Sequence, residues 1–347
     1  MVNYKTTDDG FGIHTFMLTA PLNYEKYRKL KLILQKSVWE KKESQNQSYI
    51  KSKLFMTEGY FGISSKLYMQ NGFARIEIIV NPTDLLAERY TQTEIFTSSD
   101  FCKRMLKRLN EALKLIDMTI YNFTLSRVDL CVNYVMPPAV VEAYIKLGKK
   151  SHLTENVQEK RFEDISDNRH SLTLICPSFE IEIYDKEYEI ANRTREYTLA
   201  EDYGRVLRFE VRLPRDTICK CVSRWDVHDL RRTLSYFIDD CQDIMTYCIK
   251  RSFWQGDYAT LDTAKQIIDL NSFKDKTKEL MFDILNSRKP IEEKFNGLAI
   301  NYNYSSKQIL RMKNKFKKSG ICPVTIPIRD SHKCGEFLIG IVNLFSK

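Results

Sequence analysis

The chain has little glycine or proline and no long hydrophobic run. Only 12 glycines and 9 prolines occur among its 347 residues, whereas aromatic residues make up 12%. Disordered chains are usually poor in aromatics, so this composition predicts a chain that folds throughout. No run of about 18 apolar residues occurs, so we expect no membrane-spanning helix and no membrane partner. The N-terminal sequence also lacks a basic region followed by an apolar one, so we expect a cytoplasmic protein without a signal peptide.

Several motifs of other functional classes are absent too. The nine cysteines are odd in number and irregularly spaced, which favours reduced thiols in a cytoplasm over a disulfide framework. The close pair Cys219 and Cys221 lacks the spacing and the second pair of a zinc site. There is no GxxxxGK followed by Ser or Thr and no GxGxxG, so a phosphate-binding loop for nucleotide hydrolysis is excluded. A helicase partner would have to supply its own ATPase.

The net charge is the first feature of the sequence that indicates a class of partner. The net charge is +9, which favours phosphate-rich partners because binding them releases counterions. Many basic proteins bind no nucleic acid, so charge alone does not decide the function. The length allows either one large core or two domains.

Alternating apolar and polar residues predict an antiparallel sheet. We expect strands over residues 11–20, 73–80, 125–135, 171–175, 179–190 and 206–213. Helical spacing predicts helices around 24–42, 101–116 and 140–150, and again through most of the chain after Pro214. The expected fold is therefore α+β, with a sheet and flanking helices over residues 1–215 and a mainly helical domain over 216–347.

Ionisable side chains share one face of three predicted strands. They are Arg127 and Asp129 on the first, Glu182, Tyr184 and Lys186 on the second, and Arg208, Glu210 and Arg212 on the third. If these strands are neighbours, the side chains would lie about 5 Å apart across the sheet. Asp129 and Glu210, with Glu182 or Asn133, would then form an oxygen-rich site for Mg²⁺ or Mn²⁺.

A tyrosine on the same face suggests phosphoryl chemistry. Tyr184 would attack a metal-polarised phosphate and form a phosphotyrosine, while Lys186 or Arg208 offsets the charge. Tyr188, predicted on the same strand face, is the competing nucleophile. On pattern alone, a solvated sheet face is the more common explanation of such alternation.

The order of SRVDLCVNY, IYDKEYEI and VLRFEVRL resembles the filamentous-phage gene II replication proteins and, more loosely, plasmid initiators of the Rep_trans type. RIEIIVNPTDLL and the helix after it are also similar, so the resemblance covers about residues 10–215. It implies a rolling-circle initiator, a nickase that joins its tyrosine to origin DNA, with an acidic metal site. Origin DNA and the host helicase and polymerase would be its partners.

The resemblance also implies roles for single residues. Arg127 and Asp129 match an Arg-x-Asp strand, Tyr184 and Lys186 a Tyr-x-Lys strand, and Arg208 and Glu210 an Arg-Phe-Glu strand. Tyr184 would be the nucleophile, Asp129 and Glu210 would hold the metal, and Lys186 and Arg208 would neutralise charge.

The sequence departs from these families at several points. Asn133 stands where a second acidic residue often occurs, and the strand SLTLICP lacks the tyrosine of some plasmid initiators. The His-hydrophobe-His pair of better-known nickases is absent as well. The five histidines show no metal-ligand spacing, so we expect each to be structural or exposed.

A basic helix is predicted near the C-terminus. Ser305 and Ser306 would cap it and Gly320 would end it, as part of a helix-turn-helix near residues 305–328. The residues predicted to contact DNA are Arg127, Arg212, Lys307, Arg311, Lys313, Lys315, Lys317 and Lys318. A solvated basic helix face would give the same pattern.

Two alternative functions remain open at this point. A conjugative relaxase of an integrative element would use identical chemistry. A non-catalytic protein that binds origin or operator DNA would keep the sheet and the basic helix and cleave nothing.

Overall fold

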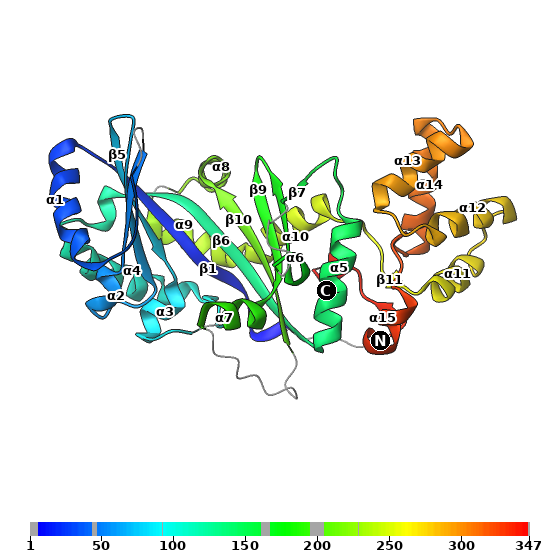
Figure 1. The fold of residues 1–347 in the computed structure, drawn as a ribbon, viewed down its shortest axis with the longest axis horizontal. Helices are drawn as coiled ribbons and strands as arrows, with labels where there is room; N and C mark the ends of the chain where they lie inside the picture. The colour runs from blue at the N-terminus through cyan, green and yellow to red at the C-terminus, as the bar shows by residue number, and fades with distance from the viewer. Residues whose placement is uncertain are drawn as a thin grey trace. The chain divides into compact units, whose positions relative to one another are not determined.

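The computed structural model describes residues 6–43, 47–91, 93–160, 167–194, 205–227 and 229–345. These residues form an α+β fold (Figure 1), as predicted. Residues 1–5, which contribute to the expectation about a signal peptide, lie outside these ranges. Within these ranges, no helix has both the length and the apolar character needed to cross a membrane.

Ten strands form one sheet in the order β2-β3-β4-β5-β1-β6-β10-β9-β8-β7. They are β1 (Thr6–Leu22), β2 (Val38–Glu43), β3 (Gln47–Ser52), β4 (Ile63–Gln70), β5 (Phe73–Val80), β6 (Thr124–Met136), β7 (Gln158–Lys160), β8 (Ser171–Cys176), β9 (Phe179–Asp185) and β10 (Arg205–Pro214). A separate two-stranded sheet pairs β11 (Tyr258–Ala259) with β12 (Phe337–Leu338).

Helices cover both halves of the sequence and dominate after β10. The first ones are α1 (Tyr24–Leu34), α2 (Leu54–Thr57), α3 (Pro82–Ala87), α4 (Cys102–Leu113), α5 (Pro138–Ser151), α6 (Asp167–His170) and α7 (Lys186–Thr194). After β10 follow α8 (Arg215–Trp225), α9 (Leu230–Asp239), α10 (Cys241–Ser252), α11 (Leu261–Asp269), α12 (Asp275–Asn286), α13 (Ile291–Tyr302), α14 (Ser306–Ser319), α15 (Ile328–Cys334) and α16 (Ile341–Leu344).

The chain divides into two compact units. The N-terminal unit comprises residues 8–132 and 210–241, and the C-terminal unit consists mainly of residues 133–209 and 242–347. The sequence predicted a single boundary near residue 215, whereas this division crosses β6 after Val132 and β10 after Phe209. These two strands are long enough for each to contribute residues to both units.

The N-terminal unit has its core between its strands and helix α4. β5 pairs antiparallel with β1 and β4, and Ile76, Ile78 and Val80 are fully buried. The predicted strand over 73–80 is thus confirmed. The helix expected over 24–42 is too long, because α1 ends at Leu34 and the chain enters β2 at Val38. A β-branched residue followed by Trp39 favours a pleated strand at this point.

The C-terminal unit contains the predicted hairpin of β8 and β9. Ser171 lies opposite Tyr184 and Thr173 opposite Glu182, while Ile181 and Ile183 are fully buried. The hairpin and its apolar face are confirmed.

One strand prediction in this unit is wrong. The strand expected over 179–190 ends at Asp185, so Lys186 and Tyr188 lie on α7 and not on the strand face of Tyr184. The Asp185 carboxylate accepts a hydrogen bond from the Tyr188 N–H at 3.1 Å. Asp185 therefore caps a helix, which stops the strand at this residue.

Helix α14 begins and ends where the sequence predicted. Ser305 and Gln308 form a capping box, and Gly320 adopts φ 74°, a left-handed conformation that glycine tolerates. The helix-turn-helix predicted near residues 305–328 contains one helix, α14, because residues 320–327 form no helix. Residues 303–305 instead connect α14 to the preceding α13, and we call α13 and α14 the helix pair. The residues after Gly320 make isolated parallel bridges at Ile321 and Ile326.

Candidate active site

The three strands that carry the ionisable motifs are consecutive neighbours. β6 bears Arg127 and Asp129, β10 follows it in the sheet, and β9 with Tyr184 comes next. The sequence could only assume this adjacency. Side chains on one face of neighbouring strands interact directly, so the predicted residues within each unit can contact one another.

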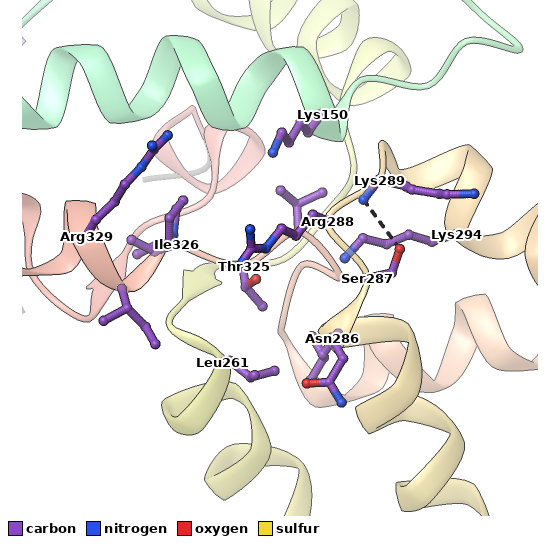
Figure 2. A pocket seen from close by; sticks show the side chains of 14 residues that line it. Lys150, Leu261, Asn286, Ser287, Arg288, Lys289, Lys294, Thr325, Ile326 and Arg329 are labelled. Atoms are coloured by element: carbon purple, nitrogen blue, oxygen red, sulfur yellow. Dashed lines mark hydrogen bonds between the residues drawn. The ribbon is translucent and has the colours of Figure 1, made fainter.

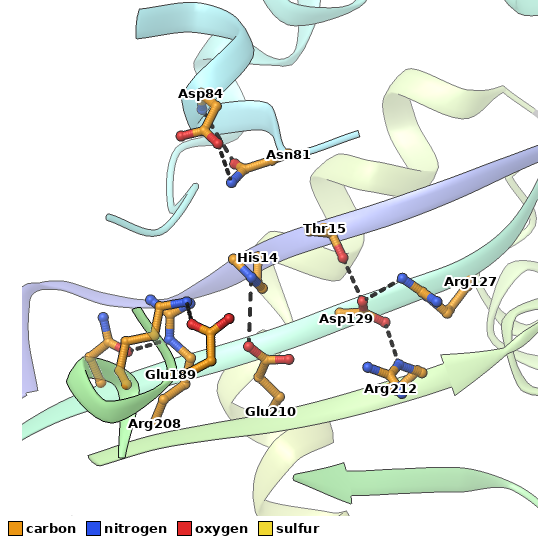
Figure 3. A network of polar contacts seen from close by, with 12 residues as sticks. His14, Thr15, Asn81, Asp84, Arg127, Asp129, Glu189, Arg208, Glu210 and Arg212 are labelled. Atoms are coloured by element: carbon orange, nitrogen blue, oxygen red, sulfur yellow. Dashed lines mark hydrogen bonds and ion pairs between the residues drawn. The ribbon is translucent and has the colours of Figure 1, made fainter. Parts of the chain in front are cut away.

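Asp129 is buried in a network of donors in the N-terminal unit (Figure 3). Its side chain is 3% exposed, and one carboxylate oxygen accepts a hydrogen bond from the Thr15 hydroxyl. Arg127 Nη2 lies 3.0 Å from that oxygen, and Arg212 Nε donates to the other oxygen at 3.3 Å. Two guanidinium groups thus balance this buried carboxylate. Its oxygens are occupied, which makes Asp129 a poorer metal ligand than the sequence suggested.

Glu210 faces a histidine that the sequence did not assign to the site. His14 Nε2 on β1 lies 3.7 Å from Glu210 Oε1, and their side chains are 18% and 6% exposed. Carboxylate oxygen and imidazole nitrogen are both ligands of first-row divalent metals. The spacing of the histidines could not predict this pair, because Glu210 is about two hundred residues away from His14 in the sequence.

Glu210 and His14 are the side chains of the N-terminal unit that could hold the metal expected from the resemblance. No group of three or more potential ligands was found among His, Cys, Asp and Glu in the described ranges. An ion held by Glu210 and His14 would therefore need water or substrate phosphate to complete its shell, as Mg²⁺ commonly does.

Tyr184 lies on the half-buried face of β9, close to a cation. The Lys186 ammonium is 5.8 Å from the centroid of the Tyr184 ring. Lys186 is only 3% exposed, and its Nζ lies 2.7 Å from Glu189 Oε2. A buried cation beside a phenol stabilises the charge that the phenol develops as a nucleophile. The sequence predicted that Lys186 lies near Tyr184 because both would be on one strand. Lys186 does lie near Tyr184, but it is the first residue of α7.

Tyr188 has a different environment from Tyr184. Its ring stacks on the His170 imidazole, with centroids 3.6 Å apart and planes 13° apart. The fully buried Asp185 lies 2.9 Å from Arg205 Nη1 and 3.8 Å from His170 Nδ1. Burial holds the pKa of His170 below its usual value, against the opposing effect of Asp185. Tyr188 is therefore part of a packed cluster, which favours Tyr184 as the nucleophile.

Glu187, at the start of α7, is a second group that the sequence did not single out. Burial raises the pKa of its carboxyl to about 7, and the charge of Asp185 acts in the same direction. A carboxyl group that changes charge near neutral pH is suited to proton transfer. Its burial arises from tertiary packing, so no local sequence pattern predicts it.

Arg208 and Glu182 complete the predicted set in the C-terminal unit. Arg208 is completely buried, and its Nε donates to Asn133 Oδ1 at 2.7 Å. Asn133, which replaces the second acidic residue, thus orients a buried guanidinium. Glu182 is half-buried opposite Thr173, on the same strand face as Tyr184.

The predicted basic residues of α14 do not all face solvent. Lys315 donates to Thr277 Oγ1 at 3.0 Å, and Lys313 lies 5.6 Å from the centre of the Phe295 ring. Lys317 is exposed but lies 5.6 Å from the Trp254 ring. The exposed residues that share one helix face by their spacing are Lys307, Arg311, Asn314 and Lys318. We call these four the basic face.

Comparison with known proteins adds no relative. No protein-family model and no curated protein matches this sequence. The function proposed next is supported by strand order, polar contacts and the basic face.

Proposed function

We propose that the protein initiates rolling-circle replication by nicking and rejoining one strand of origin DNA. The observation that supports this most is the strand order β6-β10-β9. In this order, the three strands whose motifs resemble those of the phage initiators lie next to one another. The buried charges on these strands add support, since a merely solvated sheet face would leave them exposed.

The proposed reaction is a transesterification. The Tyr184 oxygen attacks the scissile phosphorus and loses its proton, and the bond from phosphorus to the 3′ oxygen breaks. The 3′ oxygen takes up a proton, and the 5′ phosphate stays on the tyrosine. Lys186 and Arg208 offset the negative charge at this centre. Glu210 and His14, in the N-terminal unit, would hold a divalent ion, which supplies Lewis-acid chemistry when bound.

The remaining predicted residues would orient other side chains or bind DNA. Asp129 orients Arg127 and Arg212, which the sequence predicted as DNA contacts. Glu182, which the sequence predicted as a metal ligand, lies in the C-terminal unit on the strand face of Tyr184. The basic face of α14 follows a short turn after α13, an arrangement suited to reading origin duplex.

The experiment uses supercoiled DNA carrying the origin of the protein's own element, with Mn²⁺ or Mg²⁺. We expect open circles with protein attached to the 5′ end, and none with Tyr184→Phe. Tyr188→Phe is the matched control and should still nick. A nick that survives Tyr184→Phe moves the nucleophile to Tyr188, and no nick on a verified origin contradicts the proposal.

A non-catalytic DNA-binding protein is the second candidate. The closed network around Asp129 favours it, because a carboxylate held by two arginines has no need of a metal. Such a protein would bind the origin through the basic face and leave the DNA intact. A relaxase would share the nicking chemistry, and only its DNA substrate would distinguish it.

A further inference from the structure

The C-terminal unit contains a pocket of about 510 Å³ that is lined by cations (Figure 2). Its positively charged lining residues are Lys150, Arg288, Lys289, Lys294 and Arg329. No carboxylate is among the residues that line it. Segments far apart in the sequence form its wall, namely the end of α5, the loop from α12 to α13, and residues 324–329. This is the chemistry of an anion site.

Lys294, on α13, is the fixed cation of the pocket. It is 5% exposed, and its Nζ donates to the carbonyl oxygens of Ile284 at 3.1 Å and Pro323 at 2.6 Å. An ammonium has three N–H donors, so these carbonyls use two of them. Burial, with a smaller contribution from the charge of Lys150, lowers the pKa of Lys294 to about 8. The group is therefore charged at neutral pH, and a bound anion would recover part of the cost of burying it.

The side chains converge on the space that they enclose. Figure 2 shows the ammonium groups of Lys150 and Lys294 directed into the pocket from two different sides, whereas that of Lys289 points away. Ser287 and Thr325 add hydroxyl groups, and Leu261 adds an apolar surface.

The size and the mixed wall indicate what kind of anion fits. The volume lies within the range of about 300–1,000 Å³ typical of sites for whole small molecules, and a bare phosphate would not need the apolar wall. A nucleotide has a phosphate for the cations and a sugar and base for the apolar surface. The stacked bases of a duplex cannot enter a concave pocket, whereas a single strand can turn a nucleotide outward.

We propose that this pocket binds the phosphate and sugar of one nucleotide in single-stranded DNA. The inference rests on the proposed function, because origin nicking produces an unpaired strand. It also places strand binding at the base of the helix pair, since the loop that lines the pocket leads into α13 and then α14.

The test measures binding of a fluorescent oligothymidine strand by anisotropy. Lys150→Ala combined with Arg288→Ala removes two lining charges and leaves the carbonyl contacts of Lys294 intact. The control combines Lys274→Ala with Lys276→Ala, which removes equal charge from exposed positions at the start of α12, outside the pocket. We expect at least about tenfold weaker binding for the pocket variant and little change for the control. Lys150→Glu is a second variant with the same expected loss.

Three outcomes would overturn the inference. Equal affinities of pocket and control variants would show that the pocket does not hold the strand, and so would a loss confined to the control. Calorimetry with free thymidine monophosphate separates the sources, because a pocket that binds the nucleotide but not the strand is a small-molecule site. The nicking assay is scored separately. A protein that nicks while both variants bind equally keeps its proposed function and loses the pocket inference.

Discussion

The buried charges of β6 and β10 and those of the helical pocket are balanced in opposite ways. Asp129 is buried with two guanidinium groups around it. Lys294 is buried with carbonyl oxygens around it, and the other charged residues lining its pocket are cations. A balanced buried carboxylate stabilises one geometry, whereas unbalanced cations favour an incoming anion. Buried charges that are balanced within the chain thus stabilise its own structure, whereas unbalanced ones can bind a ligand.

The largest expected effect comes from Tyr184. Tyr184→Phe keeps the ring beside Lys186 but removes the oxygen that would attack phosphorus. We expect the single-turnover nicking rate to fall by at least about 10³-fold, because loss of a nucleophile leaves only binding contributions. Origin binding should stay unchanged in a gel-shift measurement. A rate within about threefold of the wild type would refute the assignment.

The next effect concerns stability. Asp129→Asn leaves Arg127 and Arg212 without their buried counter-charge, so the free energy of unfolding should fall by about 3 kcal/mol. Urea unfolding of the full chain measures this. Asp117→Asn is the control, because Asp117 pairs with Lys26 and Lys29 but is 69% exposed. Its ion pairs are exposed to solvent, so Asp117→Asn should lower stability much less than Asp129→Asn does. If both variants lose equal stability, the predicted difference between buried and exposed ion pairs is wrong.

The basic face should give a smaller effect, on duplex binding. Arg311→Ala removes one exposed cation, so we expect affinity for origin duplex to fall by about tenfold and the salt dependence to weaken by about one phosphate contact. Lys315→Ala is the matched control from the same helix, because Lys315 donates to Thr277. A titration at several salt concentrations checks both. An equal loss from Lys315→Ala would contradict the assignment of the basic face.

The smallest effect is the pH dependence of Lys294. Its folded pKa of about 8 lies below the usual value of about 10.4, so the unfolded chain binds more protons at intermediate pH. Stability should therefore rise with pH through this window, by about 1 kcal/mol between pH 7 and 9. Lys294→Met should lack this rise when both proteins are unfolded in urea in a buffer without phosphate. Identical slopes for the two proteins would show that Lys294 does not carry an unbalanced charge.

The interpretation of that slope depends on the pH range. Burial raises the pKa of Cys322, which interacts with Lys294, to about 12. A raised thiol pKa lowers stability as the pH rises above the ordinary thiol value. Both proteins in the comparison contain Cys322, so its opposing contribution largely cancels when the slope of Lys294→Met is subtracted from that of the wild type.

Local patterning predicted six strands of the ten-stranded sheet and missed β2, β3, β4 and β7. The alternation around Asp129 and Glu182 placed both residues on the correct strands, and Ser305 and Gly320 marked the limits of α14. Lys186 was misplaced, because the cap at Asp185 starts a helix where the charge alternation appeared to continue. His14 and the pocket were missed for a different reason. Their partners lie far away in the sequence, so only tertiary packing brings them together.

The most direct test of the central claim is to map the covalent bond between protein and DNA. The purified protein would react with supercoiled origin DNA and Mn²⁺, followed by digestion and mass spectrometry of the adduct. The account predicts a 5′ phosphate on the peptide that contains Tyr184 and none on Tyr188 or elsewhere. An adduct on another residue, or intact DNA on a verified origin, would contradict it.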